Sequence, residues 1–278
     1  MKRKVNVVLL VFMLAGVATA ELGDVDPTGL TGLWRFQDSS NWQLASIGTD
    51  LAGNLGGQQT GPWTEINPGL SDNGIRTTTD NPTVYAQVFH GIAPNGGGIY
   101  VNEYTLVMDY RETQSKAWNS LFQTAGTYNA NDGDLFIKRE GESGWISSIG
   151  IGAIGYSTQT FEANLWHRFV LSVDNSNFFR VYVDGTLFLD GAGQGVDGRF
   201  SLNPDFFLFA DDSGYDEKVW GLVGTVAVWG RAMGSSEVAD LGGWIGGAET
   251  PTPLTIVPEP ATLALLALGG LSLVRRKR

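Results

Sequence analysis

VYVDGTLFL, residues 181–189, is the stretch that decides the fold class of this chain. Two short runs of alternating side chains flank Asp184-Gly185 at its centre. A two-residue turn of type I′ between antiparallel strands needs positive φ at both central positions, and Asp and Gly tolerate that conformation. The stretch therefore predicts a tight β-hairpin.

Further strands are predicted on both sides of this hairpin. The runs are short, rich in β-branched and aromatic residues and partly alternating, and clusters of Gly, Asn, Asp and Ser separate them. The runs cover residues 83–89, 104–110, 135–138, 166–173, 179–183 and 219–229. Together with 38 glycines they predict an all-β fold, an antiparallel sandwich of two sheets.

One short helix is predicted after the last strand. Ser235 or Ser236 is its expected N-cap, Val238 and Leu241 are expected to face inward, and Gly242-Gly243 would end it. The chain contains no cysteine, so its stability must come from a hydrophobic core and not from disulfides. Nine tryptophans supply much of the apolar material for that core.

The first 20 residues have the pattern of a secretory signal. Three basic residues precede an apolar run, and Ala18 and Ala20 flank a predicted cleavage site, so Glu21 would begin the mature chain. The formal net charge is -11, and both ends of the chain are basic, so the part between them is strongly acidic. An acidic surface repels phosphate backbones, which argues against a nucleic-acid partner, and it could attract divalent cations.

The order of the motifs resembles a known family. GLWRF, YTLVMDYR, NDGDLFI, NLWHRFVLSVD, VYVDGTL, GRFSL, LFADD and GTVAVWGRAMGSSEVADLGG follow one another between Leu30 and Gly243. This order is similar to that of the laminin G-like, concanavalin A-like jelly rolls of bacterial surface proteins, and residues 164–243 carry most of the likeness. The resemblance implies two antiparallel sheets packed face to face.

The C-terminus, VPEPATLALLALGGLSLVRRKR, resembles the PEP-CTERM sorting signal of Gram-negative bacteria. Pro258, Glu259 and Pro260 would be the sorting motif, which in that family is read by a membrane-embedded processing enzyme called exosortase. An apolar segment, expected to be a short helix, follows over residues 261–274. The membrane stop would be the basic cluster Arg275, Arg276, Lys277 and Arg278.

The length of the apolar segment favours a transient anchor. As a helix, residues 261–274 would span roughly 21 Å, short of the roughly 30 Å hydrocarbon core of a bilayer. A permanent single-pass anchor is the alternative. The predicted division of the chain is therefore a signal peptide (1–20), a sandwich (21–245), an extended linker (246–256) and a sorting signal (257–278).

No enzymatic motif is evident. The paired-carboxylate spacing of retaining glucanases is absent, and so are cysteine and the G-x-S-x-G motif. The two histidines, His90 and His167, fit structural roles at a strand end and within a strand. The sequence predicts a protein that is not an enzyme.

Two acidic loops are candidate calcium sites. Asp211, Asp212 and Asp216 crowd one loop, and Asn131, Asp132 and Asp134 crowd another. Carboxylate oxygens at loop tips suit Ca²⁺, although neither segment has EF-hand spacing. A solvated acidic loop is the alternative reading.

The expected function is that of an exported, noncatalytic surface or exopolysaccharide-associated protein. Its partners would be the export machinery, an exosortase-type enzyme, and an extracellular polysaccharide or surface protein. Exposed aromatics such as Tyr156 or Tyr215 could contact that ligand. The alternatives are a structural surface component without a dedicated ligand, a membrane-anchored protein and, less favoured, a glycan-active enzyme.

Overall fold

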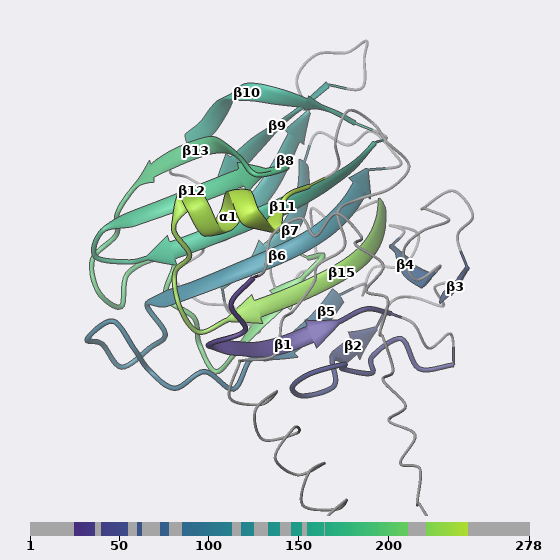
Figure 1. The fold of residues 1–278 in the computed structure, drawn as a ribbon, viewed down its shortest axis with the longest axis horizontal. Helices are drawn as coiled ribbons and strands as arrows, with labels where there is room; N and C mark the ends of the chain where they lie inside the picture. Colours follow the sequence, from purple (N-terminus) through teal and green to yellow (C-terminus); the bar gives the residue numbers. More distant parts are fainter. Residues whose placement is uncertain are drawn as a thin grey trace, which may run out of the picture.

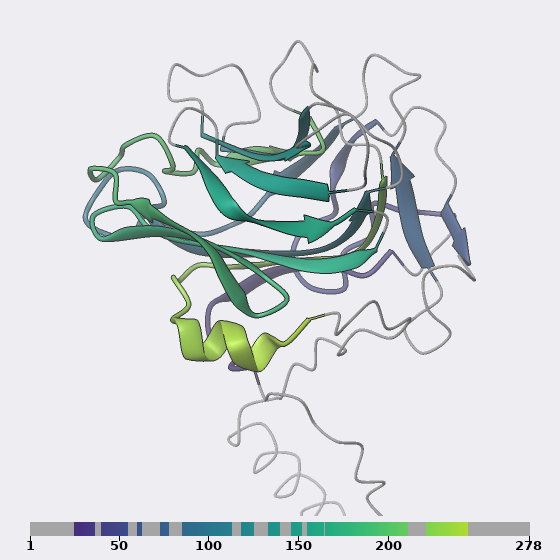
Figure 2. The same cartoon turned by 90° about the horizontal axis from the view of Figure 1, so that it is seen from above.

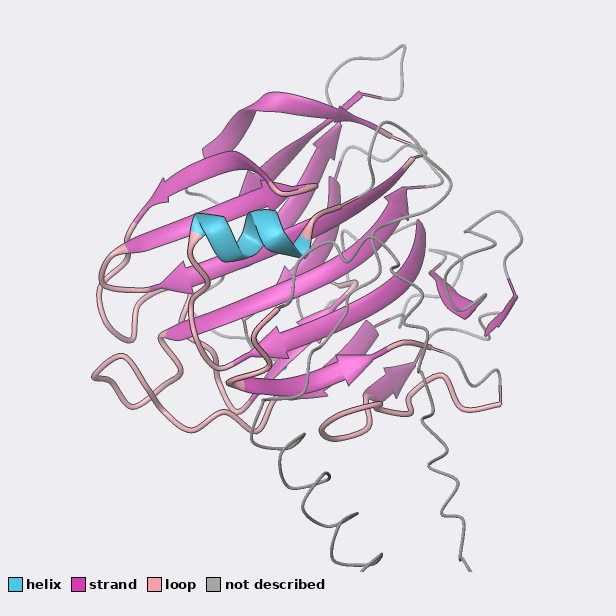
Figure 3. Ribbon diagram, in the orientation of Figure 1, coloured by secondary structure: helices cyan, strands magenta, loops and turns pink. Residues whose placement is uncertain are grey.

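The structure is a computed structural model of the full chain. It describes residues 25–36, 40–54, 60–62, 73–77, 85–112, 118–124, 133–139, 146–151, 155–163, 165–210 and 221–243. In this part the chain is a two-sheet antiparallel sandwich with one short helix (Figures 1 and 3). The all-β prediction is confirmed, whereas the predicted helices at the two ends of the chain lie outside the described residues.

The first sheet is eight-stranded. Its order is β13 (Thr186–Ala192), β12 (Phe178–Val183), β11 (Trp166–Asp174), β6 (Glu103–Glu112), β15 (Gly221–Trp229), β4 (Asn73–Thr77) and β3 (Thr60–Pro62), with β1 (Leu30–Trp34) also paired to β15. The second sheet is seven-stranded. Its order is β10 (Gly155–Glu162), β9 (Ile146–Ile151), β8 (Asp134–Arg139), β7 (Trp118–Gln123), β14 (Asp205–Leu208), β5 (Tyr85–Phe89) and β2 (Ala52–Asn54).

The hairpin at Asp184-Gly185 forms as predicted. Both residues have positive φ, 49° and 76°, and Val183 pairs with Thr186 across the turn. The alternation then shifts by one residue at Phe188, because Tyr182 pairs with Leu187 but Val181 pairs with Leu189. This β-bulge is not evident from the sequence pattern.

The hydrophobic core lies between the two sheets and is rich in aromatic rings. Members from the eight-stranded sheet include Leu106, Leu171 and Val228, which are register partners on neighbouring strands. Phe122 and Phe206 from the other sheet meet at 5.2 Å between ring centroids. Because strand side chains alternate between faces, residues adjacent to these core residues point to the outer faces of the sandwich.

A second apolar cluster covers the outer face of the eight-stranded sheet. Its floor is a row of register partners on five strands: Tyr182, Val170, Val107, Ala227 and Leu33. Helix α1 (Ser235–Leu241) lies over this face, with Val238 and Leu241 buried in the cluster as predicted. Figure 2 shows α1 on the side of this sheet that faces away from the other sheet.

The predicted N-cap of α1 is wrong by one residue. The N-cap is Gly234, and Ser235 begins the helix. The cap works through Glu237, whose carboxylate accepts a hydrogen bond from the Gly234 N–H at 3.2 Å. Glu237 therefore supplies the half of a capping box that satisfies the N-cap N–H, whereas glycine has no side chain to accept from the first turn of the helix. Gly242, with φ of 62°, ends the helix as predicted.

Candidate functional site

The outer face of the seven-stranded sheet carries a cluster of aromatic side chains. On β8, Leu135 and Ile137 belong to the core, so Phe136 and Lys138 point to the outer face. Trp118 on β7 is the register partner of Lys138. Tyr156 on β10 aligns with Phe136 through Gly150 of β9.

The rings of this cluster touch one another around the lysine. The ring centroids of Trp118 and Tyr156 are 5.7 Å apart, and those of Trp118 and Phe136 are 5.9 Å apart in an edge-on contact. The Lys138 ammonium lies 5.5 Å from the Trp118 centroid and 4.7 Å from the Tyr156 centroid, within cation–π range. Phe136 is 7% exposed and Tyr156 37%, so the cluster has a buried floor and an upper edge open to solvent.

A polar row crosses the same face beside the aromatic cluster. Gln87 on β5, Phe207 on β14, Gln123 on β7 and Asp134 on β8 are successive register partners. Gln87 donates a side-chain hydrogen bond to the Asp205 carboxylate at 2.7 Å. Gln87 is partly exposed, whereas Gln123 and Asp134 are buried, so only part of this row reaches solvent.

One hydroxyl on this face is buried without a hydrogen bond. Ser120 on β7 is the register partner of Phe136, and its Oγ has no hydrogen-bond partner among the residues that the structure describes. A buried polar group without a hydrogen bond is unfavourable and rare in folded proteins. Ser120 is fully buried, so its hydroxyl does not reach the surface of this face.

This combination of side chains suits a sugar ring. Aromatic side chains offer broad apolar surfaces, and the partly exposed Gln87 amide and Lys138 ammonium can bond to hydroxyl groups at the rim of the ring. Binding sites for small molecules commonly pair an apolar surface with a few placed polar groups in this way.

The structure brings together residues that the sequence analysis treated separately or missed. Tyr156 was predicted as an exposed aromatic and is one. Asp134 was assigned to an acidic loop, but it begins β8 and is buried, because its strand starts one residue earlier than predicted. Trp118, Phe136 and Lys138 were missed as site residues. The alternation in residues 134–139 was the available signal for the last two, whereas polar Asn119 and Ser120 obscured the strand that carries Trp118.

A separate pocket lies at the end of the sandwich where β5 ends and β6 begins. Its volume is about 330 Å³, and its lining is mostly apolar. His90, Ile92, Ile99, Tyr100 and Leu202 contribute to it, and Ile99 is 73% exposed at its rim. Asp197 holds the adjoining loop by accepting hydrogen bonds from the backbone N–H groups of Ile99 and Tyr100, and these bonds lower the pKa of its carboxyl.

His90 has a structural role in the wall of this pocket. Its Nδ1 accepts a hydrogen bond from the Ile92 N–H at 3.0 Å, so the proton of the neutral ring is on Nε2, which donates to the Asn203 carbonyl at 2.6 Å. The ring also stacks on Phe206 at 6.0 Å between centroids. The predicted reading of a satisfied imidazole at a strand end is confirmed.

Burial of His90 predicts a dependence of folding stability on pH. Burial lowers the pKa of His90 from its ordinary 6.5, while the Asn203 carbonyl and the Asp205 carboxylate act in the opposite direction. Between the lowered value and 6.5 the unfolded chain binds a proton that the folded chain does not, so stability falls as the pH decreases. We expect the free energy of unfolding, measured in urea titrations, to decrease as the pH is lowered below 6.5. In the variant His90→Gln, the free energy of unfolding should depend less on pH in this range. Parallel slopes for both proteins would contradict the assignment.

His167 also has a structural role, as predicted. Its Nδ1 lies 2.7 Å from a carboxylate oxygen of Asp184, and its Nε2 lies 2.8 Å from the carbonyl oxygen of Glu162. The other oxygen of Asp184 accepts the N–H of Arg168 at 2.8 Å. His167 thus joins the start of β11 to the turn of the hairpin.

The other predicted site residues lie outside the described part of the chain. These are Ala18, Ala20, Asn131, Asp132, Asp211, Asp212, Asp216, Pro258, Glu259, Pro260, Arg275, Arg276, Lys277 and Arg278, and Tyr215 also belongs here. Within the described residues, no group of three or more His, Cys, Asp or Glu side chains could hold a metal ion. No helix in that part of the chain is both long enough and apolar enough to cross a bilayer.

Two family models match the sequence. The model described as "Concanavalin A-like lectin/glucanases superfamily" matches residues 80–239, which is more than half of the chain. The model described as "PEP-CTERM protein-sorting motif" matches residues 257–278. No curated protein matches the chain.

Solved structures of the same fold include carbohydrate-related proteins. One is domain 4 of an extracellular arabinanase from Geobacillus stearothermophilus in complex with arabinotriose, at 16% identity and a TM-score of 0.50, covering 79% of this chain and 99% of that domain. Another is Trypanosoma rangeli sialidase in complex with sialic acid, at 19% identity and a TM-score of 0.52. That match covers 77% of this chain but only 32% of the sialidase. At these identities the likeness establishes the fold alone.

Proposed function

Because this chain belongs to the concanavalin A-like lectin/glucanases superfamily and carries a PEP-CTERM sorting motif, we propose that it is an exported glycan-recognition protein. The sorting motif implies export, processing by an exosortase and sorting to the cell envelope or surface of a Gram-negative bacterium. The finer proposal is that the sorted protein binds a polysaccharide through the outer face of the seven-stranded sheet. The final location of the protein would be the cell surface or the extracellular matrix.

The observation that carries the proposal is the aromatic cluster of Trp118, Phe136 and Tyr156 beside a polar row. In the eight-stranded sheet, the equivalent outer face is covered by α1 and its apolar cluster. The outer face of the seven-stranded sheet has its partly exposed rings in contact with one another. A domain of the same fold, from the arabinanase, has been solved with a bound arabinose trisaccharide, which is in keeping with this role.

The placement of carboxylates on this face supports binding without hydrolysis. Glycosidases hold two carboxyl groups about 5 to 9.5 Å apart. Asp134 lies on β8 and Asp205 on β14, and β7 lies between these strands. The residue of β14 that aligns with Asp134 across β7 is Phe207, two residues along the strand from Asp205. Their Cα atoms are therefore about 12 Å apart, and the Asp134 carboxylate is buried, so the two aspartates do not form a solvent-open carboxylate pair. Asp205 is also bound by Gln87.

Two further assignments remain proposals. Calcium bound by Asp211, Asp212 and Asp216 would add a cation to one loop, because carboxylate oxygens suit Ca²⁺. A purely structural surface component is the competing function, and it requires no ligand on the aromatic face.

Binding of the purified exported domain, residues 21–256, to a panel of polysaccharides tests the proposal. We expect binding to at least one neutral or acidic glycan, and we expect Trp118→Ala to weaken it by about tenfold or more, as removal of an aromatic anchor typically does. Tyr156→Ala should act in the same direction. Isothermal calorimetry or affinity electrophoresis measures the change.

Ile99→Ala is the matched control, because Ile99 is an exposed apolar residue at the rim of the separate pocket. It should leave glycan affinity unchanged. Loss of binding in this variant alone would place the site in the pocket. If the domain binds none of the polysaccharides in the panel, the result favours the alternative of a structural surface component.

A further inference from the structure

We propose that the α1 side of the sandwich is its attachment side, so that the protein, while its sorting signal anchors it, presents the outer face of the seven-stranded sheet away from the membrane. The inference rests on the sorting motif and on the position of the domain ends. It does not require that the outer face binds a glycan, so the two proposals can fail separately.

Both ends of the described domain pack on one face. Val25, the first described residue, belongs to the same apolar cluster as Val238 and Leu241 of α1. This cluster covers the outer face of the eight-stranded sheet. The chain therefore enters and leaves the sandwich on the side opposite the aromatic cluster (Figure 2).

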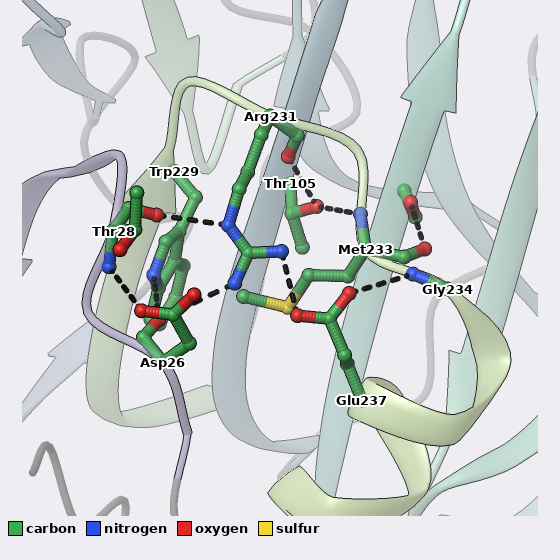
Figure 4. Close-up of polar contacts among 9 residues, drawn as sticks. Asp26, Thr28, Thr105, Trp229, Arg231, Met233, Gly234 and Glu237 are labelled. Atoms are coloured by element: carbon green, nitrogen blue, oxygen red, sulfur yellow. Dashed lines mark hydrogen bonds and ion pairs between the residues drawn. The ribbon is translucent and has the colours of Figure 1, made fainter.

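Arg231 ties these two ends together (Figure 4). Its guanidinium donates to the carbonyl oxygens of Asp26 and Thr28, at 3.3 and 2.8 Å, and to the Glu237 carboxylate in α1 at 2.7 Å. The backbone of the segment after Arg231 is also held, because Thr105 on β6 accepts the Met233 N–H at 2.9 Å. These contacts fix the N-terminal segment and α1 against the same sheet.

The point where the chain leaves α1 is held equally firmly. Arg168 donates a hydrogen bond to the Leu241 carbonyl at 2.6 Å. A Cβ atom on Gly243 would lie 2.3 Å from the Cα of Asp184, so the backbone is packed tightly against the hairpin turn. The connection to the sorting signal thus starts from a fixed position on the α1 side.

The reach of this connection limits how the domain can turn. Residues 244–256 join Gly243 to the sorting motif and can span at most about 45 Å when fully extended. A domain of this size has a radius of gyration of about 17 Å, and half the circumference of a sphere of that radius is about 54 Å. The connection is too short to pass around the domain and place the aromatic face against the membrane.

Thiol labelling tests the orientation, and the chain offers a clean background because it has no cysteine. Ser236 is exposed on α1, and Thr160 is exposed on β10, where neighbouring Phe161 points into the core. Ser236→Cys and Thr160→Cys therefore place single thiols on opposite faces. The full chain, expressed in a Gram-negative host without an exosortase, would be labelled in spheroplasts with a bulky polyethylene-glycol maleimide.

We expect Ser236→Cys to react several-fold more slowly in spheroplasts than in the same chain solubilised in detergent, whereas Thr160→Cys should react at similar rates in both. The detergent sample corrects for intrinsic thiol reactivity. Equal slowing at both positions, slowing at Thr160→Cys alone, or no slowing at either would overturn the inference. A chain recovered outside the membrane fraction would also overturn it, because the orientation depends on the tether.

Discussion

Replacing Arg168 with methionine should lower the free energy of unfolding by about 3–5 kcal/mol, because it leaves a buried carboxylate without its partner. Arg168 is buried between α1 and the eight-stranded sheet, where it binds both oxygens of Asp109 at 2.8 and 2.9 Å. Burial alone would lower the pKa of Arg168, but the neighbouring Asp109 raises it above its ordinary value. The variant would also remove the hydrogen bond to Leu241 that holds the end of α1. Denaturant unfolding followed by tryptophan fluorescence measures the loss.

Arg180→Met is the matched control for this prediction. Arg180 forms an ion pair of the same length, 2.8 Å, with Asp190, but the two side chains are 32% and 55% exposed. Exposed pairs contribute about 0–1 kcal/mol, so this variant should be nearly neutral. The double variant Asp109→Leu/Arg168→Met should regain much of the loss, because no buried charge remains. Equal effects of Arg168→Met and Arg180→Met would contradict the role of burial.

Replacing Pro258, Glu259 and Pro260 with alanine should abolish processing of the C-terminus while leaving membrane insertion intact. The substitutions barely change the hydrophobicity of the tail, so the uncleaved chain should accumulate in the inner membrane. Replacing Arg275–Arg278 with serine should act differently, since removing the positive charges lets the C-terminus pass through the membrane more often. The mass of the mature C-terminus from the native host, with and without each change, measures the outcome.

A permanent single-pass anchor gives a different result. Its retention would depend only on apolar length and flanking charge, so the alanine variant would match the unaltered protein. A mature protein that still ends at Arg278 would show that the sorting motif is not cleaved and that the anchor reading is correct.

The predictable part of the fold was the part with simple local signals. The hairpin at Asp184-Gly185 depends on two residues that tolerate positive φ, and the alternating runs at 104–110 and 166–173 are central strands of the eight-stranded sheet. The short helix followed from two inward apolar residues and a terminal glycine pair. Such signals act over a few residues, so one sequence is enough to read them.

The missed features depend on contacts between distant segments. Trp118, Lys138 and Tyr156 meet only because β7, β8, β9 and β10 are neighbours in one sheet, and no local pattern encodes that order. The Arg168–Asp109 pair joins positions 59 residues apart in the sequence. In the sequence, Arg168 and Asp109 look like ordinary strand residues. Their ion pair stabilises the fold because it is buried, and it is buried by α1, which follows much later in the chain.

Hydrogen–deuterium exchange of the domain with and without a bound oligosaccharide tests most directly the claim that the outer face of the seven-stranded sheet recognises a glycan. We predict slower exchange on binding in β7, β8 and β10, the strands that carry Trp118, Lys138 and Tyr156. Exchange in α1 and in the pocket loops at residues 91–101 should not change. Protection confined to those loops or to α1, with β7 and β8 unaffected, would contradict the account.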